Sequence, residues 1–339
     1  MKKMDRIILV FALALTACSA RVGTSDTVSR QNDAVTSGQP PARDRSWDGV
    51  DKSYDTELLK LRERIAPRFQ TLTFDDETTG KTMEYNLYVP TGYDPKTSYP
   101  LVLFMADAST TGKGAEAPLK QGYGGIIWAT DESQAEHPCF VLVPAYAGPE
   151  NAVNDNWETS DEVEMTLRLL HSVVSRYSID EDRLYTTGQS MGGMMSLYFD
   201  ANHPDLFAAS VFVAGQWDIR VLEPLADQKF FYVVSAADPK ASAGMREVGE
   251  MLKKKGVAFG MTEFSAKLSK EDQEKYIHDL LREDRRINFV QFTAETVTPP
   301  GARGPGAEHM YSFDCAYKLE AVRDWLLRQT RATSTMPPL

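Results

Sequence analysis

The stretch DRLYTTGQSMGGMMSLYF, residues 182–199, decides how the rest of the chain is interpreted. Residues 184–187 are short, apolar and β-prone, and residues 191–199 form an apolar segment that predicts the opening of a helix. Between them lies a G-x-S-x-G pattern centred on Ser190. This pattern on a strand-to-helix turn is typical of a nucleophile elbow, in which a strained backbone presents the serine. The sequence therefore predicts a nucleophile at Ser190.

Glycines surround the serine where a side chain would clash with so tight a turn. Gly188 and Gly192 stand two residues before and two after it, and Gly193 follows directly. The first N–H groups of the predicted helix point at Ser190 and favour negative charge that develops there. The alternative is a glycine-rich turn in another kind of α/β protein. The strand before the turn and the helix after it favour the elbow.

Short apolar strands alternate with helices along most of the chain. Residues 69–74 and 83–89 alternate apolar and polar side chains around a turn at Gly80, which predicts a β-hairpin. Further strands are expected at residues 101–105, 140–143, 184–187, 209–213, 230–234, 257–264 and 288–297. This βαβα order with continuous apolar strands predicts an α/β fold with a mostly parallel sheet and helices on both faces. Residues 265–285 contain a charged helix, which is either a lid or a solvated surface insertion.

The first 17 residues resemble an export signal. Three basic residues precede an apolar run that is too short to span a bilayer as a stable helix. The run ends in Leu15-Thr16-Ala17-Cys18, which resembles the lipobox of bacterial lipoproteins and implies lipidation at Cys18 after cleavage. Two or more acyl chains give stable membrane anchoring. We expect an exported protein anchored by lipid to the bacterial cell envelope; an ordinary signal peptide is the alternative.

Composition divides the remaining chain into three parts. Residues 18–46 are rich in Ser, Thr, Asp, Gln, Gly and Pro and predict a flexible tether. Residues 47–331 suit one large domain, followed by a tail at 332–339. Residues 1–17 hold three basic residues and one acidic residue, so their removal changes the net charge from −11 to −13. That charge argues against nucleic acid or an anionic membrane surface as a partner.

The cysteines and histidines give no sign of a metal site. No pair of them has the spacing of zinc ligands, and no metal or other cofactor is expected. Cys139 and Cys315 are expected to lie at opposite ends of an open sheet and to be unpaired thiols, although an exported protein could form a disulfide.

A nucleophilic serine needs a base within hydrogen-bond reach and a third group that orients the base. In elbow enzymes the chain order is Ser, then Asp or Glu, then His. Three histidines follow Ser190: His203 near the end of the elbow helix, His278 in the charged helix, and His309 on a Gly/Pro-rich loop. We favour His309, because that loop follows the last strand and precedes a helix expected at residues 316–328.

The acid is expected just beyond a strand between the serine and the histidine. Asp238 follows the strand at 230–234, at the carboxyl end where α/β sheets collect functional groups. Asp218, one strand earlier, is the second choice. Either aspartate could instead serve only as the N-cap of a helix.

Residues 179–193 and 202–209 resemble the α/β-hydrolase esterases related to polyhydroxybutyrate depolymerases and feruloyl esterases, some of whose relatives are labelled predicted peptidases. The resemblance runs from about Tyr85 to Trp325 and so covers most of the domain. It implies an α/β-hydrolase fold and cleavage of carboxylic esters through an acyl-enzyme. It also implies a triad of Ser190, Asp238 and His309.

The chain departs from that family at the expected oxyanion hole. After the strand at 101–105 the family usually has His-Gly, whereas Ala106 and Asp107 stand here, followed by Ala108. The resemblance implies that the N–H of Ala108 or Asp107 joins that of Met191 in binding the oxyanion. A carboxylate beside an oxyanion opposes the developing charge unless Asp107 turns away, is protonated or is paired. Ser235-Ala-Ala-Asp238 likewise replaces the usual His-Gly-x-x-Asp.

Two further residues are candidates for substrate contacts. Gln189 adjoins the serine, and Trp157 lies on a loop expected at the mouth of the site, where it either stacks on an acyl or aryl group or packs under the loop. Two other functions stay open. One is a serine peptidase of the same fold, and the other is a non-catalytic binding lipoprotein on a hydrolase scaffold, motivated by Asp107.

Overall fold

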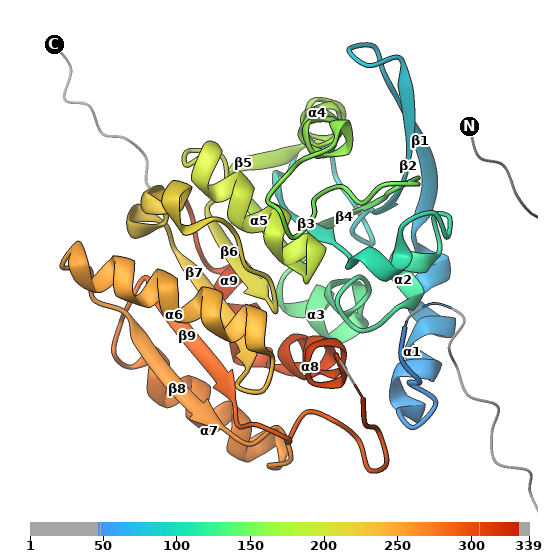
Figure 1. Ribbon diagram of the computed structural model, residues 1–339. Helices are drawn as coiled ribbons and strands as arrows, with labels where there is room; N and C mark the ends of the chain where they lie inside the picture. Colours follow the sequence, from blue (N-terminus) through green and yellow to red (C-terminus); the bar gives the residue numbers. More distant parts are fainter. Residues whose placement is uncertain (1–46, 48, 305, 332–339) are drawn as a thin grey trace, which may run out of the picture. The chain divides into compact units, whose positions relative to one another are not determined.

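The computed structural model describes residues 47, 49–304 and 306–331. The predicted signal segment 1–17, Cys18, the tether 18–46 and the tail 332–339 lie outside the described residues. Within the described part, nine strands form one sheet in the order β1-β2-β4-β3-β5-β6-β7-β9-β8 (Figure 1). The strands are β1 (Gln70–Asp76), β2 (Lys81–Tyr88), β3 (Tyr99–Met105), β4 (Phe140–Ala145), β5 (Ile179–Gln189), β6 (Ala209–Val213), β7 (Phe230–Ser235), β8 (Gly260–Phe264) and β9 (Ile287–Phe292).

The sheet is mixed at one edge and parallel elsewhere. β1 and β2 form the predicted antiparallel hairpin, with Phe74 opposite Met83, and β2 also pairs antiparallel with β4. All other neighbours run parallel. β4, β6 and β7 are buried along their whole length, because helices cover both faces of the parallel part. The edge strands β1 and β8 instead alternate exposed residues with partly or fully buried ones.

The helices divide between the two faces of the sheet. They are α1 (Thr56–Ile65), α2 (Ala117–Lys120), α3 (Asp131–Glu136), α4 (Asp161–Arg176), α5 (Met191–Asn202), α6 (Pro239–Lys254), α7 (Lys270–Leu281), α8 (Ala307–Lys318) and α9 (Glu320–Leu327). Figure 1 shows α4, α5 and α6 in front of the strands, and α7 and α9 behind them. The chain thus has the α/β-hydrolase fold, with an N-terminal hairpin, that the sequence predicted.

The charged helix is α7, and it connects two neighbouring strands. It follows β8, precedes β9, and buries Ile277 and Leu280. Its exposed residues are mostly charged, which is the pattern of a helix that covers a sheet. It also contacts α9, where Glu274 accepts the N–H groups of Glu320 and Ala321.

The C-terminal helices differ from the expectation. In place of one helix at residues 316–328, α8 begins at Ala307 and ends at Lys318, and α9 begins at Glu320. His309 therefore lies in the first turn of a helix and not on the preceding loop. The Gly/Pro-rich sequence before Ala307 concealed this helix start, since Gly306 adopts a left-handed conformation with φ 79° directly before the first turn.

Two other observations bear on earlier expectations. Cys139 and Cys315 are free thiols. Among the described residues, no helix is both long enough and apolar enough to cross a bilayer.

Candidate active site

The elbow has the strained geometry that the glycine pattern predicted. Ser190 lies between the end of β5 and the start of α5, with φ 51° and ψ −115°. A Cβ on Gly188 would lie 2.3 Å from the carbonyl carbon of Gly192, and a Cβ on Gly192 would lie 1.9 Å from the Met105 carbonyl oxygen. No side chain fits at these distances. Both glycines are therefore required for the elbow to pack against the end of β3.

Three side chains that are far apart in sequence form one hydrogen-bonded chain. The Nε2 of His309 lies 2.8 Å from the Oγ of Ser190. The Nδ1 of the same ring lies 2.5 Å from Oδ2 of Asp238. Asp238 follows β7, and its other oxygen, Oδ1, accepts a hydrogen bond from the Ala241 N–H at the start of α6. The aspartate thus caps a helix and holds the histidine at once.

The ring of His309 is supported from its own helix. The Phe313 ring, one turn further along α8, meets it edge to face with centroids 5.0 Å apart. Ser312 donates a hydrogen bond from Oγ to the His309 carbonyl at 2.7 Å. Ser235, at the end of β7, donates to Glu308 Oε2 at 2.5 Å. Ser235, which stands where the related esterases usually have histidine, therefore links β7 to the first turn of α8.

The other candidates for base and acid lie elsewhere. His203 is the C-cap of α5, and His278 lies in the last turn of α7. Asp218 caps the short 3₁₀ helix η4 (Ile219–Val221) and pairs with Arg220 at 2.7 Å. None of these three has a described contact with Ser190 or His309.

The Asp107 side chain is held by two neighbouring hydrogen-bond donors. Its Oδ2 accepts the Ser109 N–H at 3.0 Å, which caps the 3₁₀ helix η2 (Ala108–Thr110). Its Oδ1 lies 3.4 Å from Nε2 of Gln189. The carboxylate is 3% exposed and occupied by these two donors. Of the three possibilities for Asp107, the structure shows a paired side chain, whose partners are neutral donors.

The backbone around Asp107 lies next to the start of α5. Met105 pairs with Gly188, and a Cβ on Gly192 would also lie 2.9 Å from the Ala106 carbonyl oxygen. Residues 106–108 and Met191 thus flank the elbow closely. The N–H groups of Ala108 and Met191 begin η2 and α5, and the first N–H groups of a helix have no acceptor within it. They are available to bind an oxyanion.

Gln189 does not have the position expected of a substrate contact. Its side chain is only 1% exposed, and Nε2 donates to Oε1 of Gln121 at 2.7 Å. Gln121 in turn donates to Ser109 Oγ at 3.2 Å. Together with Asp107, these side chains form a buried polar network beneath the elbow and η2. The sequence concealed this role, because Gln121 and Asp107 reach Gln189 only through the fold.

Trp157 lies on an ordered loop between β4 and α4. It is 43% exposed and has a positive φ of 62°, which is uncommon for a bulky residue. The loop is tied to α6, because Lys240 contacts Asp155 at 2.6 Å and Gln216 donates to the same carboxylate. The Lys240 hydrogen bond is the main cause that holds the pKa of Asp155 below its usual value. Trp157 is therefore not buried under its loop.

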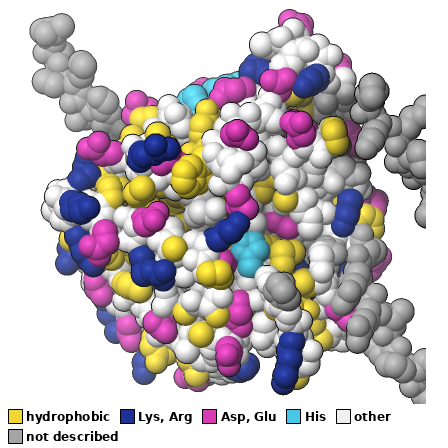
Figure 2. Space-filling model, viewed as in Figure 1, with side chains coloured by type: hydrophobic (Ala, Val, Ile, Leu, Met, Phe, Trp, Pro, Cys, Tyr) yellow, Lys and Arg dark blue, Asp and Glu magenta, His cyan; other side chains and the backbone are white. Residues whose placement is uncertain are grey.

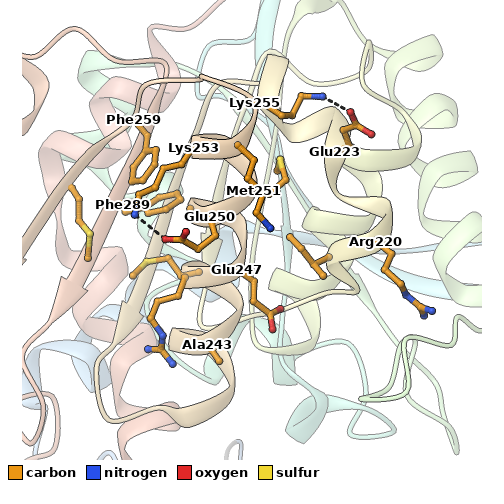
Figure 3. Close-up of a pocket in the computed structure, with 16 residues that line it drawn as sticks. Arg220, Glu223, Ala243, Glu247, Glu250, Met251, Lys253, Lys255, Phe259 and Phe289 are labelled. Carbon is orange, nitrogen blue, oxygen red and sulfur yellow. Dashed lines mark hydrogen bonds and ion pairs between the residues drawn. The ribbon is translucent and has the colours of Figure 1, made fainter.

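Two depressions in the described surface differ in their relation to the serine. One, of about 920 Å³, is bordered by Asp238, His309 and the loop 298–304. Figure 2 shows a histidine side chain at the surface near α8, in the middle of this face. The other, of about 940 Å³, lies along α6 and is lined by apolar Met251, Phe259 and Phe289 within a charged rim (Figure 3). No member of the Ser-His-Asp chain lines the second depression.

Two glycines of residues 122–125 lie where no side chain fits. A Cβ on Gly124 would lie 2.4 Å from the Phe104 ring, and one on Gly125 would lie 2.5 Å from the Pro118 carbonyl oxygen. These glycines permit close packing beneath α8 and β3.

The fold and the Ser-His-Asp geometry define the class as α/β hydrolases with a serine at a nucleophile elbow. Residues 77–230 match the family described as "Putative esterase". A curated relative, "Putative esterase NocK" of Nocardia uniformis subsp. tsuyamanensis, is 28% identical over 173 residues, which cover 45% of this chain and 46% of that protein. The chain therefore matches about half of that relative's length. These matches show that the chain is related to the α/β-hydrolase esterases, as the resemblance implied.

The solved structure of a thermostable esterase agrees with the fold of this chain. A thermostable esterase superposes with a TM-score of 0.64 at 24% identity, covering 79% of this chain and 64% of that one. A feruloyl esterase module from Clostridium thermocellum, complexed with sinapinate, has a TM-score of 0.49 at 15% identity, with coverage of 75% and 87%.

Proposed function

We propose that this protein hydrolyses carboxylic esters through an acyl-enzyme formed on Ser190. The observation that carries the proposal is the hydrogen-bonded chain from Ser190 through His309 to Asp238, built on an elbow whose glycines admit no side chain. The relation to esterases supports ester substrates. The same Ser-His-Asp arrangement activates a serine on unrelated folds. It therefore supports a nucleophilic serine independently of the fold.

The reaction follows from the positions of these groups. His309 Nε2 accepts the proton of Ser190 as the serine oxygen attacks the ester carbonyl carbon, and Asp238 holds the imidazolium through Nδ1. The N–H groups of Met191 and Ala108 bind the resulting oxyanion. His309 then gives the proton to the departing alcohol. Water attacks the acyl-enzyme by the same route, which releases the carboxylic acid and restores the serine.

The environment of Asp107 is compatible with this oxyanion site. A carboxylate directed at the oxyanion would oppose its charge, whereas this one is bound to the Ser109 N–H and lies beside Gln189. The cap also fixes the backbone that presents the Ala108 N–H. Trp157, exposed on the loop tied to α6, is proposed to contact the acyl or alcohol group.

Burst kinetics with a chromogenic short-chain ester test the mechanism. We expect a burst equal to the concentration of active sites, and its loss in Ser190→Ala. The matched control is Ser175→Ala, which removes an exposed hydroxyl on α4 and should leave the burst unchanged. A fluorophosphonate probe should label the parent and the control but not Ser190→Ala. A folded parent that neither turns over esters nor takes the probe contradicts the proposal and favours a binding protein; peptide amides cleaved as fast as esters favour a peptidase.

We also propose that the protein is exported and anchored through lipid at Cys18. The support is the basic start, the short apolar run and the Leu15-Thr16-Ala17-Cys18 pattern. Expression in a bacterium followed by mass spectrometry of the mature N-terminus tests this. Cys18→Ser should abolish the lipid modification and release the protein from the membrane fraction, and a parent that begins at Met1 without lipid contradicts it.

A further inference from the structure

The helix that carries His309 begins without a side-chain cap. The residue before α8 is Gly306, which provides no side-chain cap, and the preceding sequence is a loop rich in glycine and proline. Side-chain hydrogen bonds join the first turn to other elements through Glu308 with Ser235 and His309 with Asp238 and Ser190, and Ala307 and Met310 pack against the core. The remaining contacts that fix the helix must therefore come from residues further along it.

A buried ion pair holds α8 from another face. Lys52 Nζ lies 2.8 Å from Asp314 Oδ2, and the two side chains are 1% and 3% exposed. Asp314 Oδ1 also accepts the Tyr123 N–H at 2.9 Å. Asp314 follows His309 by five residues, so it points about 140° away from it around the helix axis. Asp314 thus binds Lys52 and Tyr123 on a side of α8 other than the one that carries the imidazole.

The partner of this pair belongs to a well-anchored segment. Residues 51–55 precede α1, whose Leu58 and Ile65 are fully buried, and Asp55 caps α1 through the Leu58 N–H at 3.0 Å. Figure 1 shows this first part of the described chain (blue) beside α8 (red).

Two more contacts join the same segment to α8. Tyr311 donates its hydroxyl to the Asp51 carbonyl at 2.9 Å, and Lys318 lies 2.6 Å from Asp55. We call residues 51–55 with their contacts on α8 the α8 clamp.

The ion pair is tightly packed against Gly122. A Cβ on Gly122 would lie 2.4 Å from Asp314 Oδ1 and 2.9 Å from Lys52 Nζ. A glycine at this position is therefore what lets the two charges and the Tyr123 N–H meet. Burying two charges costs desolvation energy that their attraction roughly offsets, so such a pair contributes geometry more than stability.

From this geometry we infer that Lys52 and Asp314 are positioning residues for His309. The ion pair fixes the rotation and height of α8, and through them the distance between the imidazole and Ser190. The inference rests on the proposed function, since it assigns His309 the role of base. Misplacement of a catalytic group by about 1 Å costs up to about 100-fold in rate. Loss of the Lys52–Asp314 ion pair should therefore slow the reaction at Ser190 while the three residues of the Ser-His-Asp chain remain present.

The test compares Lys52→Met with a control that breaks an ion pair elsewhere. At a temperature where each variant is folded, Lys52→Met should lower kcat by about 10- to 100-fold with KM within about threefold of the parent. The rate of fluorophosphonate labelling should fall in parallel. The control is Arg168→Met, which leaves Asp76 without its two bonds from Arg168, at 2.7 and 2.8 Å, between the β1–β2 hairpin and α4. It should lose thermal stability and keep the parent kcat.

Each result decides the inference. A Lys52→Met variant with the parent kcat and labelling rate overturns it, whatever its loss of stability. If that variant does not fold, Gly122→Ala takes its place, because it displaces the pair while keeping both charges; unchanged kcat there overturns the inference too. A parent without activity or labelling instead refutes the proposed function. The His309 side-chain NMR resonances then test the clamp without turnover: they should move in Lys52→Met but not in Arg168→Met, and identical spectra in all three proteins overturn it.

Discussion

Two substitutions of Asp107 separate the effect of its charge from the effect of its N-cap. Asp107→Asn removes the charge but keeps an oxygen able to accept the Ser109 N–H, which lies 3.0 Å from the carboxylate. Asp107→Ala removes both. If the residue acts by fixing η2 and with it the Ala108 N–H, the two variants must differ. If it acts by placing negative charge near the oxyanion, they must resemble each other.

The size of the effect follows from the cap and from the donor that it fixes. An N-cap lost to alanine costs about 1 kcal/mol, which corresponds to about a fivefold change in the population of the ordered turn. Complete loss of one oxyanion donor costs about 100- to 1,000-fold in kcat. We therefore expect Asp107→Ala to lower kcat by between about fivefold and 100-fold, because the turn loosens while the N–H group remains. Asn is as good a cap as Asp, so Asp107→Asn should stay within about threefold of the parent.

Single-turnover acylation with a chromogenic ester measures this directly, since it isolates the step in which the oxyanion forms. Thermal unfolding in the same buffer shows that each variant is folded at the assay temperature. An increase in the acylation rate in both variants refutes the reasoning, because it would mean that the carboxylate opposes the oxyanion despite its cap. Equal loss in both would refute it as well, since asparagine keeps the hydrogen bond.

Two further expectations follow from the same geometry. Gly192→Ala puts a Cβ 1.9 Å from the Met105 carbonyl oxygen, so any folded variant must separate α5 from β3 and should lose burst and probe labelling together; a labelled, active variant would contradict the packing of the elbow. Burial raises the pKa of Asp200 from 3.8 to about 7. The folded protein thus holds this proton more tightly than the unfolded chain, and the resulting stability is complete below about pH 4 and is lost as the pH rises to about 7. The free energy of unfolding in urea, measured from pH 4 to 8, should fall with pH in the parent by up to about 4 kcal/mol more than in Asp200→Asn. The same dependence on pH in both proteins would contradict this.

The sequence was most informative where a local pattern has only one structural explanation. The glycines around Ser190 have no other use than a tight strand-to-helix turn, and the chain order of acid and histidine in elbow enzymes led to Asp238 and His309, which the structure brings together. The sheet was predictable for a similar reason, because continuous apolar strands separated by helices pack in few ways. The start of α8 was missed because glycine as N-cap and an Ala-Glu-His first turn give little capping signal.

Residues that act through long-range contacts could not be found in this way. Nothing near Lys52 in the sequence indicates a buried partner at Asp314, since lysine is a common surface residue and the two stand at opposite ends of the domain. The same holds for Gln189, whose neighbours Gln121 and Asp107 meet it only after β3 and β5 have paired. Local patterns report local requirements, and these contacts are set by the packing of the whole fold.

The two aspartates near the serine show why capping and function need not be alternatives. A carboxylate has two oxygens, and a helix N-cap uses one of them to accept an N–H. In Asp238 the cap occupies Oδ1 and leaves Oδ2 for His309; in Asp107 it occupies Oδ2 and leaves Oδ1 toward Gln189. The cap holds the side chain in one orientation before any substrate binds, so the second oxygen meets its partner at little further cost in entropy. An aspartate that starts a helix at the carboxyl end of a strand is thus well prepared to orient a catalytic base, and the N-cap reading of Asp238 supports the functional one.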